Sequence, residues 1–296
     1  MREASRHGTR GDEGTARLAR ALLSLKGPGG TAIVPANMPL PSRRTILAPV
    51  PDRDFDPTEL AIPWHVLSKA GHSVVFASES GQGAPRADPI TLGGPIPKGL
   101  RVSPEALERY RELERDAAFQ KPLRWEDIEP DGYDALLLPG GHAPGMRPYL
   151  ESPLLQARLA AFWATGRPVG AICHGVLALA RTKGPDGRSV LYERRTTALT
   201  KFMEFGAYAL TFPRVGRHYR TYDAYLEDEV RSLLGHPSQF ERGPLVLSGR
   251  PRPEAGFVVE DGHYLSARFP GDAWVFAQRF LAKVEVLPAR SMAAST

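Results

Sequence analysis

The sequence predicts an α/β protein in which a doubly wound, mostly parallel sheet is sandwiched by helices. From residue 45 onward, short apolar runs that suit buried strands alternate with helical stretches, and no internal repeat is visible. The chain opens with a strand, a helix and a second strand, the unit from which parallel sheets are built. Ligands of such sheets bind where the strands end, so we expect the site in the loops that follow them.

The opening unit is marked by its apolar runs and by a helix start signal. Residues 45–50 are an apolar run short enough for a buried strand, and residues 73–77 give the next strand. Between them a helix is expected from Pro57, which suits a first helical turn, with Asp56 as its cap. Glu59 lies in the first turn of this helix.

Residues 88–130 depart from this rhythm and are predicted to be an insertion. A Gly- and Pro-rich passage leads into a charged helix that begins at about Ser103. An excursion of this size is often a lid or an interface, and a merely decorative surface helix fits the sequence equally well. Residues 1–44 are predicted to be a partly ordered N-terminal tail, which leaves 45–296 as the α/β domain.

The alternation resumes after the insertion. The expected elements are strands at 135–138 and 169–172, a helix at 152–165, and a helix after Cys173. The later part of the chain is less regular, with a possible strand at 196–200, an apolar segment at 202–213, a helix at 222–234, strands at 257–260 and 264–267, and a closing helix at 272–284.

Composition excludes several classes of function. The net charge is +5, but the basic residues are scattered and form no nucleic-acid motif, so we expect no nucleic-acid partner. A single cysteine excludes an intramolecular disulfide and fits a reducing compartment. No apolar run approaches the ~20 residues of a membrane span, and no signal-peptide core lies near Met1, so a cytoplasmic protein without membrane contact is expected.

The only cysteine, Cys173, stands where an expected strand runs straight into a helix. A side chain at such an elbow is held at the edge of the sheet, and the free N–H groups of the helix favour a thiolate there. His174 follows directly, Gly175 lets the backbone come close, and the loop at Gly140 and Gly141 could offer amide donors. The alternative is that Cys173 is simply a small buried hydrophobic residue.

These residues carry a family resemblance. Leu138-Pro139-Gly140-Gly141-His142 and Ala171-Ile172-Cys173-His174-Gly175, together with Glu59, resemble the ThiJ/PfpI superfamily within the class I glutamine amidotransferase-like, flavodoxin-like fold. The resemblance covers about residues 45–284. The chain is most similar to the heat-shock chaperone and glutathione-independent glyoxalase III branch.

The resemblance implies a role for each of these positions. It makes Cys173 the nucleophile, His174 its general base, and Glu59 a buried carboxyl that shares a proton with the sulfur. The amides of Gly141 and His174 would form the oxyanion hole. Glu204, which follows a Phe downstream of the cysteine, would be the third member of the triad and would orient His174. Relatives also suggest a homodimer.

Physical reasoning supports these roles unevenly. A carboxyl beside a thiolate should have a raised pKa, but Glu59 could instead be a solvated glutamate facing its own helix dipole. Sequence neighbours do not face each other on a helix, so His174 reaches Cys173 only if the elbow rotates the cysteine. Glu204 could equally lie on the outer face of a helix.

The rest of the pocket is less defined by the sequence. Gly140, His142 and Phe55 are expected to line it, although a loop histidine such as His142 is often satisfied by backbone groups. No two histidines have the spacing of a metal motif, so no metal and no cofactor are expected. Residues 266–270 depart from the composition usual for this loop in the family, which leaves the substrate open.

The leading hypothesis is a cysteine-dependent enzyme on small reactive carbonyls, of the glyoxalase III or deglycase type. The Cys173 thiolate would add to methylglyoxal to give a hemithioacetal, His174 would move the proton between the two carbons, and water would release lactate. One alternative is another thiol hydrolase or hydratase, namely an amidase, peptidase or isonitrile hydratase. A second alternative is a stress chaperone or thiol redox sensor without turnover.

Overall fold

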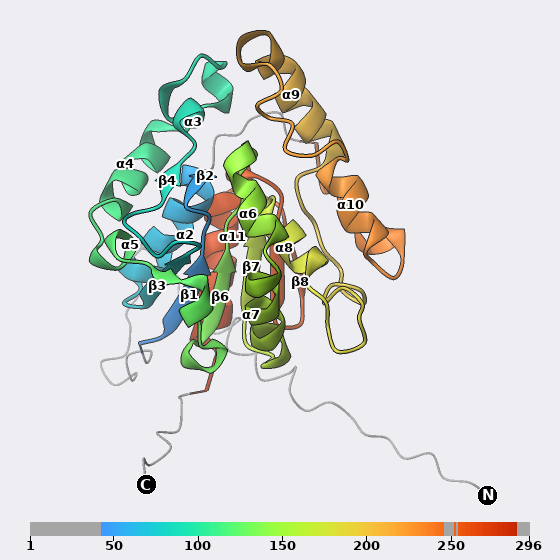
Figure 1. Ribbon diagram of the computed structural model, residues 1–296. Helices are drawn as coiled ribbons and strands as arrows, with labels where there is room; N and C mark the ends of the chain where they lie inside the picture. The colour runs from blue at the N-terminus through green and yellow to red at the C-terminus, as the bar shows by residue number, and fades with distance from the viewer. Residues whose placement is uncertain (1–42, 246–251, 253, 289–296) are drawn as a thin grey trace, which may run out of the picture. The chain divides into compact units, whose positions relative to one another are not determined.

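The computed structural model describes residues 43–245, 252 and 254–288 (Figure 1). These residues form one compact unit. Its centre is a seven-stranded sheet of order β5-β3-β1-β6-β7-β9-β8, in which only β8 runs antiparallel to its neighbour. The expected tail at residues 1–44 lies outside the described residues apart from Arg43 and Arg44.

The strands of the main sheet are β1 Thr45–Pro49, β3 Ser73–Ser78, β5 Leu123–Arg124, β6 Ala135–Leu138, β7 Val169–Ile172, β8 Val258–Asp261 and β9 Tyr264–Ala267. A separate parallel pair is formed by β2 Arg53–Phe55 and β4 Arg86–Ala87. The predicted doubly wound, mostly parallel sheet is therefore confirmed.

The α-helices are α2 Pro57–Lys69, α3 Pro89–Gly93, α4 Pro104–Leu113, α5 Ala117–Gln120, α6 Arg147–Glu151, α7 Pro153–Ala164, α8 Gly175–Arg181, α9 Lys201–Val215, α10 Leu226–Ser232 and α11 Ala273–Glu285. Short 3-10 helices lie at Lys98–Leu100, Trp125–Asp127, Pro130–Gly132, Pro144–Met146, Pro237–Gln239 and Pro270–Asp272. Among the described residues, no helix is long and apolar enough to cross a membrane.

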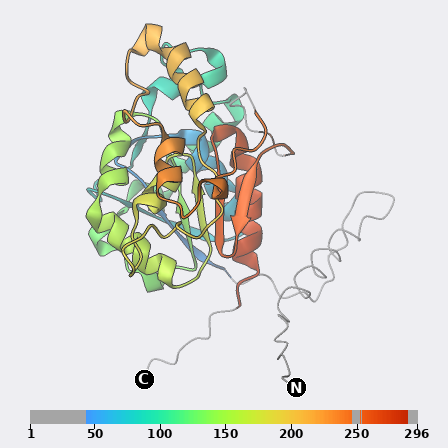
Figure 2. The ribbon, with the colours of Figure 1, turned by 90° about the vertical axis from the view of Figure 1, so that its right-hand side faces the viewer.

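Helices cover both faces of the sheet. Helices α2 and α11 pack together on one face, with α11 against β7 and β9, and α7 and α8 cover the other face. Figure 2 shows green α7 and red α11 on opposite sides of the strands. The buried strands β6 and β7 are apolar throughout, as expected for strands that are covered on both faces.

Local capping explains where the predicted helices begin. Asp56 accepts hydrogen bonds from the amides of Thr58 and Glu59, and Pro57 occupies the first turn of α2. Ser103 and Ser152 cap α4 and α7 in the same way, each followed by proline. The first backbone amides of a helix have no acceptor within the helix, and the capping side-chain oxygen accepts their hydrogen bonds. Proline has no amide hydrogen and needs no acceptor, so a capping residue followed by proline marks the start of each helix.

The expected insertion at 88–130 holds α3, α4, α5 and the edge strand β5. Helix α4 packs on α2, while the passage from Ile96 to Val102 lines the pocket described below. The insertion is therefore not only a decorative surface helix, because part of it forms a wall of that pocket.

One expectation for the later chain was wrong, and another was confirmed only in part. Residues 196–200 form no strand, and only Thr196 makes an isolated bridge, to Phe240. The reason is that Thr197 donates its amide to the Ser266 hydroxyl of β9, whose two edges are already paired with β7 and β8. The helix expected at 222–234 is shorter, because the chain becomes helical only at Leu226, whose amide is bound by Glu204.

Candidate active site

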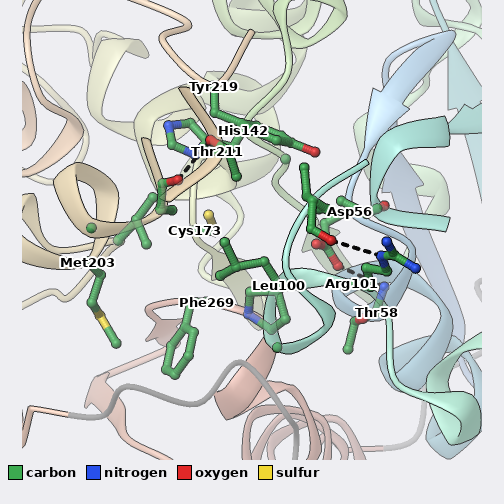
Figure 3. Close-up of a pocket in the computed structure, with 18 of the residues that line it drawn as sticks. Asp56, Thr58, Leu100, Arg101, His142, Cys173, Met203, Thr211, Tyr219 and Phe269 are labelled. Atoms are coloured by element: carbon green, nitrogen blue, oxygen red, sulfur yellow. Dashed lines mark hydrogen bonds between the residues drawn. The ribbon is translucent and has the colours of Figure 1, made fainter. Parts of the chain in front are cut away.

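The loops after β1, β6 and β7 meet at one edge of the sheet. Leu138 of β6 pairs with Ala171 of β7, so the segments that follow these two strands start side by side. They place Gly140 and Cys173 next to Glu59 of α2, and a pocket of about 200 Å³ opens above them (Figure 3). The predicted location of the site, at the carboxyl ends of the strands, agrees with this arrangement.

Cys173 occupies a strained elbow between β7 and α8. Its φ angle is +56°, in the left-handed region that residues other than glycine seldom adopt. The side chain is only 4% exposed but reaches the pocket. Strain of this kind persists where the surrounding structure enforces it, and it turns the sulfur out of line with the helix.

Two glycines make room for this elbow. A Cβ on Gly140 would lie 2.6 Å from the amide nitrogen of His174 and 2.8 Å from Cβ of Cys173. A Cβ on Gly175 would collide with the backbone carbonyl of Leu138. Both positions therefore require glycine because two backbones approach closely, independently of any turn conformation.

Glu59 is completely buried behind the cysteine. Its Oε2 accepts a hydrogen bond of 3.0 Å from the amide of Gly140, while Oε1 has no hydrogen-bond partner among the described residues. Burial raises the pKa of Glu59 well above its usual value, and Asp56 raises it further, against the opposing effects of the Cys173 thiol and the Gly140 amide. The expected raised pKa is confirmed, and the solvated alternative for Glu59 is wrong.

The thiol behaves differently from the sequence-based expectation. Burial raises the pKa of Cys173 well above its usual value, and the carboxyls of Glu59 and Asp56 act in the same direction, whereas the amide of His174 lowers it. The expected stabilisation of a thiolate by the following helix is therefore not dominant. The pKa values of Glu59 and Cys173 are both shifted upward, so burial favours the protonated form of each group.

His174 lies within reach of the sulfur. Its Nδ1 is 3.6 Å from Sγ of Cys173, a contact that the rotated elbow allows. The ring is 1% exposed, and burial together with the neighbouring His142 lowers its pKa to about 3. His174 is therefore neutral at physiological pH, so that one ring nitrogen can accept a proton. It is not among the residues that line the pocket.

Glu204 is buried and points into the site, so the outer-face alternative is wrong. Its Oε1 lies 3.5 Å from Nε2 of His142, and its Oε2 accepts a 2.8 Å hydrogen bond from the amide of Leu226. Burial alone would raise the pKa of Glu204, but His142, His174 and this amide together lower it. The carboxylate is thus ionised and its direct partner is His142, whose ring centroid lies 5.1 Å from that of His174.

The same three side chains are the candidate metal ligands. One ligand atom from each of His142, His174 and Glu204 lies within 4.8 Å of the others. The three residues were expected in the site, but no metal-ligand spacing marks them in the sequence, because they come from three distant segments. Nε2 of His142 and Oε1 of Glu204 are 3.5 Å apart, and the Arg220 guanidinium lies 3.7 Å from Glu204. A guanidinium beside the carboxylate disfavours a further cation there, and the expectation of no metal stays a prediction.

The pocket differs in part from the predicted one. His142 lines it, but Phe55 is fully buried and packs edge-on against Tyr110 and Phe119, so its assignment to the pocket was wrong. Gly140 lies behind Cys173, outside the lining. Gly141 is in the wall, as an oxyanion-hole donor requires, and its role stays a prediction.

Sequence reasoning missed several polar residues of the pocket wall. Tyr219 lines the pocket beside His142 and donates a 2.6 Å hydrogen bond to Asp88. Asp56 also lines it, and burial raises its pKa to about 6. The sequence signalled Asp56 only as a helix cap, and nothing in the sequence pattern marked Tyr219.

The fold and the site define a class: an α/β protein with a cysteine at a strained strand-to-helix elbow, backed by a buried glutamate. A family model described as ThiJ/PfpI family-like matches residues 50–244, and the chain belongs to this family.

Individual relatives agree with this assignment. The chain is 31% identical to a protein named deglycase PYRAB04690 from Pyrococcus abyssi, over 77% of this chain and 92% of the relative. It is 30% identical to the glutathione-independent glyoxalase hsp3102 of Schizosaccharomyces pombe, over 49% of this chain but only 59% of that protein. The crystal structure of glyoxalase III from Candida albicans has the same fold, with a TM-score of 0.59 and 19% identity over 81% of this chain and 97% of that chain.

Proposed function

We propose that this protein is a cysteine-dependent enzyme that converts small 2-oxoaldehydes such as methylglyoxal into 2-hydroxy acids without glutathione. The observation that carries the proposal is the placement of Cys173 at the floor of the pocket, with His174 Nδ1 3.6 Å from its sulfur and Glu59 buried behind it. Relatives named glyoxalase and deglycase support the same type of chemistry.

The first step is addition of the thiol to the aldehyde carbon. A bond forms between Sγ and C1, and the thiol proton passes to the carbonyl oxygen, which gives a neutral hemithioacetal. His174 relays this proton through Nδ1, and because its pKa is about 3 it passes the proton on instead of keeping it. The amides of Gly141 and His174 would stabilise the developing oxyanion, an effect of roughly 3 kcal/mol per donor.

The second step moves a proton from C1 to C2 of the bound substrate. The resemblance assigns this transfer to His174, but His142 is the histidine that lines the pocket. The ionised Glu204 carboxylate, 3.5 Å from His142, would stabilise the imidazolium that forms when His142 removes the C1 proton. Loss of the C1 proton gives an enediol. Return of that proton to C2, with transfer of the C1 hydroxyl proton to the oxygen on C2, gives a thioester of the 2-hydroxy acid, and water then releases the acid and the thiol.

The proposal is tested by incubating the purified protein with methylglyoxal in the absence of glutathione and measuring lactate. We expect turnover that is abolished in Cys173→Ser and strongly reduced in Glu59→Gln, His142→Gln and His174→Gln. No turnover by the unaltered protein, or full turnover by Cys173→Ser, would overturn the proposal. Suppression of client aggregation that persists in Cys173→Ser would favour the chaperone alternative instead.

Homodimer formation and a cytoplasmic location remain predictions. Sedimentation of the purified protein at several concentrations decides the first, and fractionation of the source cells decides the second.

A further inference from the structure

We infer that the pocket is built for 2-oxoaldehydes whose ketone carries an apolar group larger than methyl, such as a branched alkyl chain or a phenyl ring. This inference rests on the proposed function and adds the part of the substrate that is remote from the aldehyde carbon.

Both polar and apolar side chains line the pocket. Figure 3 shows Cys173 between two groups of side chains: His142 and Tyr219 lie on one side, and Met203 and Phe269 on the other. Three segments contribute apolar lining residues, namely Ile96 and Leu100, then Leu199, Met203 and Leu210, and finally Phe269; Ile96 and Leu100 pack in one cluster with Tyr219. The dicarbonyl unit of a substrate needs the polar side, so any substituent on the ketone carbon would extend along the apolar side.

The apolar wall is larger than methylglyoxal can use. A cavity of about 200 Å³ holds several times the volume of a single methyl group. A methyl substituent would leave most of the apolar wall in contact with water, whereas a branched alkyl or aryl substituent would cover it. Burial of each additional methylene is favourable enough to change affinity about fourfold.

Helix α9 supplies the second observation. Phe202 is 58% exposed and Leu210 is 56% exposed, yet both line the pocket. Large apolar side chains that border a catalytic pocket and remain open to water gain contacts when a ligand covers them. The insertion adds Leu100 to the same lining, so two separate segments of the chain offer apolar contacts to a bulky substituent.

The test compares kcat/KM of the full-length protein for a series of 2-oxoaldehydes with methyl, propyl, isobutyl and phenyl substituents. We expect kcat/KM to rise by about fourfold per added methylene, so that the isobutyl compound exceeds methylglyoxal by at least tenfold. Short assays limit the known reaction of phenylglyoxal with arginine.

A matched pair of variants on α9 locates the effect. In Leu210→Ser, the increase of kcat/KM with the size of the substituent should be lost. In Phe212→Ser this increase should be the same as in the unaltered protein, because Phe212 is half exposed on the same helix but does not line the pocket. Thermal unfolding verifies that both variants fold. We expect both to fold because the replaced side chains are exposed. This inference alone is overturned if methylglyoxal is turned over but kcat/KM does not increase with the size of the substituent, or if Leu210→Ser does not change that increase. No turnover of any member overturns the proposed function as well.

Discussion

Glu204 Oε1 lies 3.5 Å from Nε2 of His142, and this contact joins the pocket to a buried carboxylate. The ionised Glu204 faces His142, whereas His174 sits deeper and burial lowers its pKa to about 3. The two histidines therefore have different environments and suit different steps of the proposed reaction.

Replacing Glu204 by Gln should lower kcat by about 10-fold to 100-fold, because the variant keeps an acceptor for the Leu226 amide but loses the charge opposite His142. Glu227→Gln is the matched control. Glu227 is also 1% exposed and also accepts a backbone amide, that of Lys201, but it lies outside the pocket around Cys173. Steady-state kinetics and thermal unfolding separate the two effects, and equal values of kcat in both variants would contradict the assignment.

Alkylation of Cys173 should be slow at neutral pH. Burial and the neighbouring carboxyls raise its thiol pKa, so the rate of iodoacetamide labelling should rise only above the ordinary thiol pKa of ~8.5. All cysteine labelling reports on Cys173, because the chain has one cysteine. Rapid labelling at pH 6–7 would instead support the thiolate expected from the sequence.

Removal of metal ions should leave the activity unchanged. The Arg220 guanidinium next to Glu204 disfavours a second cation among His142, His174 and Glu204. Activity with methylglyoxal should be the same before and after dialysis against EDTA, with metal content measured in both samples. A loss of activity that added zinc restores would show that these three residues bind metal.

The fold was predictable because its signals are local. The apolar runs at 135–138 and 169–172 coincide with strands β6 and β7, and the caps Asp56 and Ser152 set the starts of α2 and α7. The exception at 196–200 has a long-range cause. Threonines favour strands, but here the Thr196 hydroxyl and the Thr197 amide bind side chains of Tyr264 and Ser266 on β9.

The site was only partly predictable because its properties depend on burial and on long-range contacts. The elbow motif identified Cys173, His174 and Glu59 as neighbours, but it did not reveal that burial raises the pKa of the thiol. The partner of Glu204 was assigned to the wrong histidine, because no sequence pattern links residue 204 to the loop that holds His142. Such contacts arise only when the sheet brings the loops together.

Replacing Gly140 by Ala should disrupt the elbow. The new Cβ would overlap the His174 amide and Cys173 Cβ, at 2.6 and 2.8 Å, and both atoms belong to a tightly packed strand-to-helix turn. We expect a loss of about 1–3 kcal/mol in the free energy of unfolding and at least a tenfold drop in kcat/KM. Gly132→Ala is the control, because a Cβ there meets nothing within 4 Å. Similar stability and activity of the two variants would show that the turn at Cys173 can shift to accommodate the new Cβ.

Glu59→Gln should stabilise the protein increasingly as the pH rises. Burial raises the pKa of Glu59 in the folded state, so between the unfolded value of 4.5 and the raised folded value the folded state binds the additional proton. The unaltered protein therefore loses stability as the pH increases through this range, whereas glutamine carries no titrating proton and can still accept the Gly140 hydrogen bond. We expect urea unfolding to give similar free energies of unfolding for the two proteins at pH 4.5 and a higher free energy for Glu59→Gln at pH 8.

The Glu59→Gln variant should at the same time lose most of its activity, which separates the proton held by Glu59 from a purely structural role of its side chain. A constant difference in free energy between pH 4.5 and pH 8 would mean that Glu59 is ionised in the folded protein and that Cys173 alone carries the proton of the pair.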